Sequence, residues 1–260
     1  MLSMRTMSVV IPAYNEMGNL ENAVKDVVHA LQEFDDYEVI IVNDGSKDGT
    51  GEVADRLAAT IDRVRVIHHE QNRGFSASYQ TGLANARMAY FTFVPGDHEV
   101  AAESVEEIFD AVGKADLVIP YHGTPWNRTW HRRVLTWICT TQLNVLFSRN
   151  LHYFQGPAVY PTELARILPI NTSGFFFATE MLVNALLMGY SYVEVPLIHH
   201  ERTYGQSKAV KPSNIVNAQL TILRLWWSLR VRRGVLARPS SVGASAPALS
   251  REAGAGSALS

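Results

Sequence analysis

The sequence predicts an α/β fold with a mostly parallel central sheet and helices on both faces. Short apolar runs rich in Val and Ile alternate with stretches of about ten to fifteen residues whose apolar side chains recur at helical spacing. Polar segments that contain glycine follow several of the apolar runs directly. Strands that alternate with helices of this length form βαβ units, in which helices join parallel strands and cover the sheet.

The elements can be placed in order along the chain. Strands are expected at residues 8–12, 38–42, 64–67, 89–94, 115–119, 157–160 and 191–195. Helices are expected at 20–34, 50–60, from Gly74 to about 87, from 104 onward, and at 130–147, 162–168, 178–188 and 213–233. Ser104 and Glu107 have the spacing of a capping box at the start of the fourth helix.

A chain of 260 residues suits one large domain or two small ones, with an ample core. We expect that domain to span residues 1–235, in two halves that meet near residue 119. The residues after it, 236–260, are mostly Ala, Ser, Gly and Pro. This composition predicts a disordered tail.

Charge is divided sharply between the two halves. Residues 1–116 hold 20 acidic against 9 basic residues, a net charge of −11, whereas residues 117–260 hold 5 against 14, a net charge of +9. The second half is therefore expected to meet an anion, such as a phosphorylated substrate, a nucleic acid or an anionic membrane.

The single cysteine, Cys139, excludes an internal disulfide and a cysteine metal cluster. The residues before the first strand, Met1 to Met7, are too few and too weakly apolar for a signal peptide. Both observations favour a reducing, cytoplasmic setting. The pairs His68–His69 and His199–His200 lack the spacing of a metal pair on a helix face, and we expect ordinary roles for them.

Two carboxylates follow the apolar run 91–94 at a sharp turn. Pro95 and Gly96 end the strand, and Asp97 and Glu99 stand one residue apart beyond it. Acids at the carboxyl end of a buried parallel strand can ligate a divalent cation, with a diphosphate completing its shell. Acids near the start of the next helix are equally expected from the helix dipole alone.

Four motifs in order resemble the signature of family 2 glycosyltransferases with a GT-A fold. They are Val10-Ile-Pro-Ala-Tyr-Asn-Glu16, Val42-Asn-Asp-Gly-Ser-x-Asp-Gly-Thr50, Asn72-Arg-Gly74 and the Asp97 turn. A fifth, Arg202-x-x-Gly205-x-Ser-Lys208, resembles a late motif of dolichyl- and polyprenyl-phosphate sugar synthases. The resemblance covers roughly residues 7–230.

The resemblance implies a GT-A fold with a nucleotide-binding half, 1–119, and an acceptor-binding half, 120–235, that carries interfacial helices. It implies that Tyr14 offers the nucleotide an aromatic surface, that Glu16 accepts from ribose hydroxyls, and that Asp44 accepts from the N–H edge of the base. The implied residues for the nucleotide sugar are Pro12, Tyr14, Glu16, Asn43, Asp44, Ser46, Asn72, Arg73, Gly74 and Gly96.

Asp97 and Glu99 are implied ligands of Mg²⁺ or Mn²⁺, which stabilises charge on the leaving diphosphate. Two positions depart from the family pattern. Pro95 stands where the family usually has the first Asp of Asp-x-Asp, and Asn43 replaces an Asp in the second motif. Glu99 restores a second carboxylate to the turn.

The implied acceptor is a polyprenyl phosphate, whose second pKa of about 6 leaves it largely ionised near neutral pH. It can attack the anomeric carbon without a dedicated general base. The expected catalytic residues are Asp97, Arg202 and Lys208, and the expected contacts to the acceptor phosphate are Arg128, Arg132 and Arg133. Arginine suits phosphate because its planar guanidinium donates two hydrogen bonds at once. A solvated helix face explains Arg132 and Arg133 equally well.

The helices at 130–147 and 213–233 carry tryptophan on an apolar face beside arginine. This pattern suits helices that lie on a membrane, and it suits a packed terminal helix with a basic outer face equally. Spacing of this kind disfavours nucleic acid as the partner. The resulting interpretation is a peripheral enzyme on the cytoplasmic face of the membrane.

Two other functions remain open from the residues. A transferase of the same fold could use a saccharide, a protein or a non-phosphorylated lipid as acceptor, and would then need a base such as Glu180 or Glu201. The second open function is that of a degenerate homologue that binds a nucleotide without catalysis, for which Pro95 would be a sign of lost metal chemistry.

Overall fold

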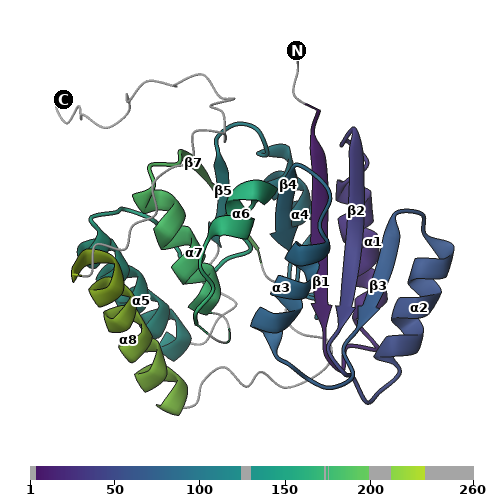
Figure 1. Cartoon of the computed structure of the whole chain (residues 1–260), viewed down its shortest axis with the longest axis horizontal. Helices are drawn as coiled ribbons and strands as arrows, with labels where there is room; N and C mark the ends of the chain where they lie inside the picture. The colour runs from purple at the N-terminus through teal and green to yellow at the C-terminus, as the bar shows by residue number, and fades with distance from the viewer. Residues whose placement is uncertain (1–3, 124–129, 173, 175, 199–211, 232–260) are drawn as a thin grey trace.

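The computed structural model describes residues 4–123, 130–172, 174, 176–198 and 212–231. Within these residues, five strands form the main sheet in the order β3-β2-β1-β4-β6 (Figure 1). The strands are β1 (Thr6–Ala13), β2 (Asp36–Asn43), β3 (Val64–His68), β4 (Tyr90–Phe93) and the short β6 (Tyr160–Pro161). β1 to β4 run parallel and β6 pairs antiparallel with β4. The mostly parallel sheet expected from the sequence is confirmed.

The second half of the chain adds a small sheet of its own. β5 (Leu117–His122) pairs in parallel with β7 (Tyr192–Leu197), and an isolated bridge joins Val118 to Val159, just before β6. The strand expected at 115–119 is therefore present, but β6 lies between it and β4 in place of a direct pairing.

Helices cover both faces of the main sheet, as Figure 1 shows. They are α1 (Leu20–Ala30), α2 (Thr50–Thr60), α3 (Phe75–Asn85), α4 (Ala102–Asp110), α5 (Trp130–Phe147), α6 (Thr162–Ile167), α7 (Phe176–Leu187) and α8 (Pro212–Trp226), which continues as a π-helical turn, Trp227–Val231. Within the residues described, no helix combines the length and the apolar character needed to cross a membrane.

The alternation of side chains along the strands divides the core into two layers. Val9 and Ile11 point to the layer built with α1, α2 and α4. Val10 points to the opposite layer, where Tyr79 of α3 and Phe177 of α7 lie with their ring centroids 4.6 Å apart. Both layers are apolar because the strands are covered on both faces.

The predicted capping box at Ser104 is wrong. α4 begins at Ala102, and the Ser104 hydroxyl accepts a hydrogen bond from the backbone N–H of Ile198 at 2.9 Å. The hydroxyl thus ties α4 to the end of β7 instead of capping its own helix.

Candidate active site

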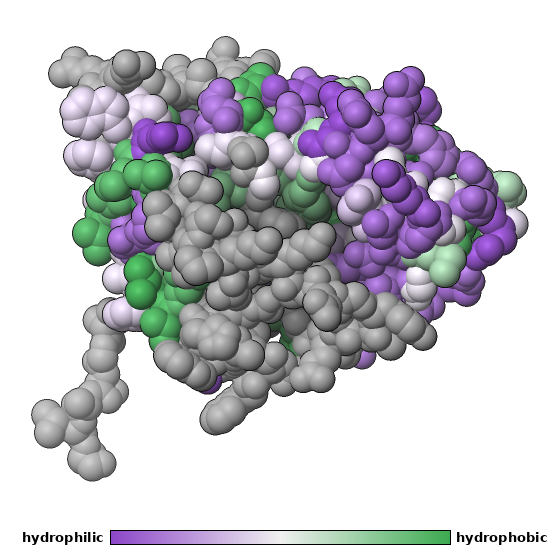
Figure 2. All heavy atoms as spheres, turned by 90° about the horizontal axis from the view of Figure 1, so that it is seen from below, coloured by the Kyte–Doolittle hydropathy of each residue, from purple (hydrophilic) through white to green (hydrophobic). Residues whose placement is uncertain are grey.

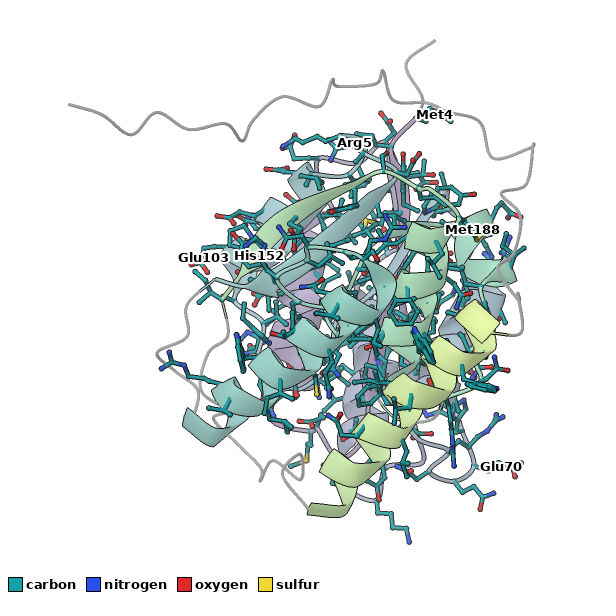
Figure 3. All side chains as sticks on the ribbon, turned by 90° about the vertical axis from the view of Figure 1, so that its left-hand side faces the viewer. Met4, Arg5, Glu70, Glu103, His152 and Met188 are labelled. Atoms are coloured by element: carbon teal, nitrogen blue, oxygen red, sulfur yellow. The ribbon has the colours of Figure 1, made fainter. Side chains whose placement is uncertain are left out.

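The central strand of the sheet marks the place where a ligand is expected. β1 lies between β2 and β4, so the order of strands reverses at β1, and open α/β sheets bind ligands beside such a reversal, beyond the carboxyl ends of the strands. In Figure 3, Met4 and Arg5 mark the opposite, amino end of β1, and Glu70, just beyond β3, lies at the carboxyl edge. The predicted site loops after β1, β2 and β4 all leave the sheet at this edge.

The loops after β1 and β2 are joined by hydrogen bonds. The backbone N–H of Asn15 donates to the Ser46 hydroxyl at 3.0 Å, and the Asn15 side chain accepts from the N–H of Lys47 at 2.9 Å. The N–H of Glu16 donates to the Thr50 hydroxyl at 2.8 Å. Asn15 has a φ of 56°, a left-handed conformation that asparagine tolerates better than most residues. The two loops therefore form one unit, which fixes the backbone around Tyr14 and Glu16.

The side chains expected to hold the base and ribose differ in exposure. Tyr14 is 41% exposed at this edge, so its ring can stack on a ligand. Glu16 is partly buried, and its carboxylate accepts from the side chain of Asn19 at 2.8 Å. Pro12 is buried, and its carbonyl faces the turn after β4.

Asp44 is buried under the loop that follows β3 and carries Arg73 and Gly74, and it is only 3% exposed. Its Oδ1 accepts from Nδ1 of His69 at 2.7 Å and from the N–H of Arg73 at 2.9 Å, and its Oδ2 accepts from the N–H of Gly74 at 2.8 Å. The ring of His69 is fixed on its other side by Thr81. Asp44 thus supports the Arg73–Gly74 backbone, and its direct contact with a base stays a prediction.

Asn43 and Gly45 hold the loop after β2 against its neighbours. The Asn43 side chain accepts from the N–H of Ser46 at 3.2 Å and lies 3.0 Å from Nδ1 of His68. Gly45 has a φ of +66°, and a Cβ there would lie 2.4 Å from the carbonyl carbon of Gln71. Asn72 therefore borders the same loop that carries Ser46.

The turn with the two carboxylates lies on the other side of β1. The N–H of Gly96 donates to the Pro12 carbonyl at 3.1 Å, and a Cβ at Gly96 would meet that same oxygen at 3.1 Å. Glycine thus permits the close approach that brings Asp97 beside the end of β1. Asp97 and Glu99 are both partly buried, and the N–H of Glu99 lies 3.3 Å from Oδ1 of Asp97.

The basic residues expected at the acceptor side are described only in part. Arg133 is exposed on α5. Arg132 lies on the same helix, but its side chain is outside the described part of the chain, as are the residues Arg128, Arg202 and Lys208 altogether.

Backbone hydrogen bonds hold the described residues that directly precede residues 124–129 and 199–211, namely Gly123 and Ile198. The N–H of Gly123 donates to the carbonyl of Leu197 at 3.1 Å, so the ends of β5 and β7 are adjacent. The N–H of Ala101 donates to the Ile198 carbonyl at 3.1 Å. Ile198, the last described residue before the Arg202 motif, is therefore hydrogen-bonded to Ala101, which lies four positions after Asp97.

Glu180, considered from the sequence as a base, is already engaged in other contacts. It is 4% exposed on α7, and its carboxylate accepts four hydrogen bonds, from the backbone and side chains of Asn171 and Thr172. These donors make it the anchor of the loop before α7. Glu201, the other base considered, lies outside the described residues.

Two functional candidates have no signal in the sequence. His69 was expected to be an ordinary strand-end residue, but it completes the buried network of Asp44. His98, between the two carboxylates, contacts Asp26 of α1 at 2.8 Å. Neither residue shows a motif, because its partner lies 25 or 72 positions away.

Sheet order and loop positions define an α/β protein with a GT-A-like fold, whose distinctive loops gather at one edge of the sheet. Among solved structures, glucosyl-3-phosphoglycerate synthase from Mycobacterium tuberculosis, in complex with Mn²⁺, UDP and phosphoglyceric acid, superimposes with a TM-score of 0.65 at 19% identity. The match covers 92% of this chain and 82% of that one. It agrees with the expected fold.

The chain belongs to glycosyltransferase family 2, whose model, glycosyl transferase family 2, matches residues 8–168. A polyprenol monophosphomannose synthase from Mycolicibacterium smegmatis is 34% identical, over 88% of this chain and 90% of that protein. An undecaprenyl-phosphate mannosyltransferase from Micrococcus luteus is 28% identical, over 87% of this chain and 98% of that protein. The protein is therefore a glycosyltransferase.

Proposed function

We propose that this glycosyltransferase moves a hexose from a nucleoside-diphosphate sugar, GDP-mannose or a UDP-hexose, to a polyprenyl phosphate of the dolichyl or undecaprenyl type, with inversion at the anomeric carbon. The observation that carries the proposal is the bond between Ala101 and Ile198. It joins the carboxylate turn of the donor side to the start of the segment that holds Arg202 and Lys208. Residues 1–119 then bind the donor, and residues 120–235 bind the acceptor.

On the donor side, the joined loops after β1 and β2 form the floor for the nucleotide. Tyr14 stacks on the base, and Glu16 accepts hydrogen bonds from the ribose. The residues that border this floor are Pro12, Asn43, Ser46, Asn72, Arg73, Gly74 and Gly96. Asp44 supports the backbone of Arg73 and Gly74 among them.

The carboxylates of Asp97 and Glu99 suit Mg²⁺ or Mn²⁺, because hard cations prefer oxygen ligands. The described residues contain no group of three or more His, Cys, Asp or Glu able to hold a metal alone. A site of two carboxylates fits a cation that shares its shell with a substrate diphosphate, the usual arrangement for Mg²⁺. When bound, the ion neutralises charge that develops on the leaving diphosphate.

On the acceptor side, an ionised phosphate oxygen attacks the anomeric carbon as the bond to the diphosphate breaks. No proton has to be removed from the phosphate at neutral pH. The engaged carboxylate of Glu180 supports a mechanism without a base on α7. Arg202 and Lys208 orient the two phosphates, and Arg128, Arg132 and Arg133 attract the acceptor.

The proposed location is the cytoplasmic face of a membrane, with α5 and α8 against the lipid. Apolar side chains are exposed along the outer side of each helix: Val134, Trp137, Ile138 and Val145 on α5, Leu220 and Leu223 on α8, and Trp227 on the π-helical turn that follows α8. Figure 2 has hydrophobic atoms at the left-hand end, where these helices lie in Figure 1. The other side of α8 packs into the core through Ile222 and Leu225, and the π-helical turn adds Leu229.

Charge supports a lipid surface as the occupant of this face. Neither α5 nor α8 contains an acidic residue, and Arg133 and Arg224 are exposed on them. Exposed tryptophan beside arginine, without acidic residues, matches the interface of an anionic bilayer. One side of α8 packs in the core and the other is exposed, so a packed terminal helix is compatible with a side that faces a membrane.

The test of the reaction uses labelled GDP-mannose and UDP-glucose with undecaprenyl phosphate, dolichyl phosphate and, as control, the unphosphorylated polyprenol. We expect labelled glycolipid from a lipid phosphate and none from the polyprenol. Activity should disappear with EDTA and return with Mn²⁺ or Mg²⁺. Failure of every donor with every lipid phosphate contradicts the proposal, and equal transfer to the polyprenol contradicts the role of the acceptor phosphate.

The test of location is co-sedimentation with vesicles that contain anionic lipid. The double variant Trp137→Ser and Trp227→Ser should reduce the bound fraction, because it removes the two largest exposed side chains of this face. Ile167→Ser is the matched control, since Ile167 is 44% exposed on α6, which packs against α3, β4 and β6. Equal binding of all three proteins contradicts the assignment of this face.

A further inference from the structure

Three contacts help to attach the carboxylate turn to the rest of the fold. The first is the backbone bond from Gly96 to Pro12 of β1, and the second is the bond from Ala101 to Ile198 after β7. The third is a side chain, His98, whose Nε2 lies 2.8 Å from Oδ2 of Asp26 on α1. The last contact reaches the turn at its centre, between Asp97 and Glu99.

The backbone of His98 is in a conformation that needs support. Its φ is 54°, in the left-handed region that is uncommon for residues other than glycine, although asparagine, aspartate and histidine adopt it more often than the rest. Such a conformation persists where surrounding contacts hold it. His98 lies between the two carboxylates, so its backbone conformation affects how Asp97 and Glu99 are directed relative to each other.

The His98–Asp26 pair has the burial expected of a positioning contact. The two side chains are 29% and 28% exposed, so the contact is partly shielded from water. Beside it, a small gap between α1 and the turn is lined by Ala23, Val94 and Val100. Among the residues that line this gap, Asp26 is the one whose side chain offers a polar partner to the His98 ring.

Resting on the proposed function, we propose that His98 and Asp26 are positioning residues for the divalent-cation site. Asp26 holds the His98 ring, the ring holds the left-handed backbone, and the backbone presents Asp97 and Glu99 together. This chain has Pro95 where family 2 glycosyltransferases usually have a further carboxylate. The affinity for the cation therefore depends more on the geometry of the two remaining acids, Asp97 and Glu99. The pair itself does not touch the cation or the substrates.

The main test measures the Kd of Mn²⁺ by calorimetry in the presence of UDP or GDP. His98→Ala and Asp26→Ala should each raise it about tenfold, the effect typical of removing a group that orients metal ligands. His98→Asn should recover part of the loss, because asparagine tolerates the left-handed conformation. The double variant should be no worse than either single variant, because the two residues act through one contact.

A matched control exists on the same helix. His29 of α1 lies 3.6 Å from Glu106 of α4, and both side chains are largely exposed. His29→Ala removes a histidine–carboxylate contact between α1 and its neighbour without touching the turn. Its Kd for Mn²⁺ should stay within about twofold of the unmodified protein, as expected for a surface pair.

A second measurement separates this inference from the proposed function. Hydrogen exchange of residues 97–101 should accelerate in His98→Ala and Asp26→Ala and stay unchanged in His29→Ala. If the unmodified protein binds no Mn²⁺ with either nucleotide, the metal assignment is wrong, and exchange alone decides whether the pair holds the turn. An unchanged Kd and unchanged exchange in His98→Ala, or equal effects of His29→Ala, overturn the inference.

Discussion

The buried carboxylate of Asp44 offers a sharp test of how the nucleotide loop is held. Replacing it by asparagine keeps the size of the side chain but turns one of its two oxygens into an N–H₂ donor. Oδ1 of Asp44 already accepts two hydrogen bonds and Oδ2 accepts one, so the new amide group must face a donor, either Gly74 N–H or His69 and Arg73. At least one bond is lost whichever way the amide turns.

The size of the effect follows from these contacts. A hydrogen bond to a charged group contributes about 1.5–3 kcal/mol, and an unsatisfied buried donor costs a similar amount. Asp44→Asn should therefore lower the free energy of unfolding by about 1.5–3 kcal/mol. At about 2–4 °C per kcal/mol for a domain near this size, Tm should fall by about 3–12 °C.

The chain supplies a control with the same chemistry at the surface. Asp55 lies 3.0 Å from Nε2 of His68, but the two side chains are 63% and 41% exposed. Surface pairs of this kind contribute about 0–1 kcal/mol, so Asp55→Asn should change little. Urea unfolding of both variants gives the comparison, and calorimetry with UDP or GDP should show weaker binding for Asp44→Asn alone. Equal stability of the two variants would refute the view that Asp44 anchors Arg73 and Gly74.

Three further predictions concern the core and α7. Gly82→Ala should cost about 1–3 kcal/mol in urea unfolding, because the added Cβ would lie 2.3 Å from Cγ2 of Val10 in the central strand; an unchanged midpoint contradicts this close packing. Glu180→Gln should cost about 1.5–3 kcal/mol for the same reason as Asp44, yet keep kcat within about tenfold, whereas loss of a general base lowers kcat about 10²- to 10⁴-fold. Burial raises the pKa of Tyr160 above its ordinary value, so the unfolded chain loses its phenolic proton first, and stability present below about pH 10 is lost as the pH rises further. Tyr160→Phe removes a buried hydroxyl that has no hydrogen-bond partner among the described residues, so it should be neutral or stabilising at pH 8 and should reduce the alkaline loss; an equal loss at pH 10.5 argues against this assignment.

The sequence predicted the donor half, residues 1–119, in detail because each signal there lies within a few neighbouring residues. Short apolar runs rich in Val and Ile indicated β1 and β2, and the polar motifs follow directly at their carboxyl ends. Parallel strands bring those ends to one edge, so Tyr14, Ser46 and Asp97 could be grouped from the order of the strands alone. The exposed stripe on α5 was visible for the same reason, since helical spacing places Val134, Trp137 and Ile138 on one side.

Contacts between distant residues were decided only by the tertiary structure. The sequence made Ser104 a capping residue, but its hydroxyl meets Ile198, which is 94 positions away. It predicted Asp44 as a contact for the base, and only the structure showed that His69, Arg73 and Gly74 also bond to its carboxylate.

The sequence by itself determined the strand and helix alternation, the family motifs and the edge of the sheet where they gather, because each depends on neighbours a few positions apart. Only the tertiary structure decided which acids are engaged, which histidines support them and which side of α8 is covered. Hydrogen bonding and burial depend on partners brought together from distant parts of the chain, and no local pattern records them.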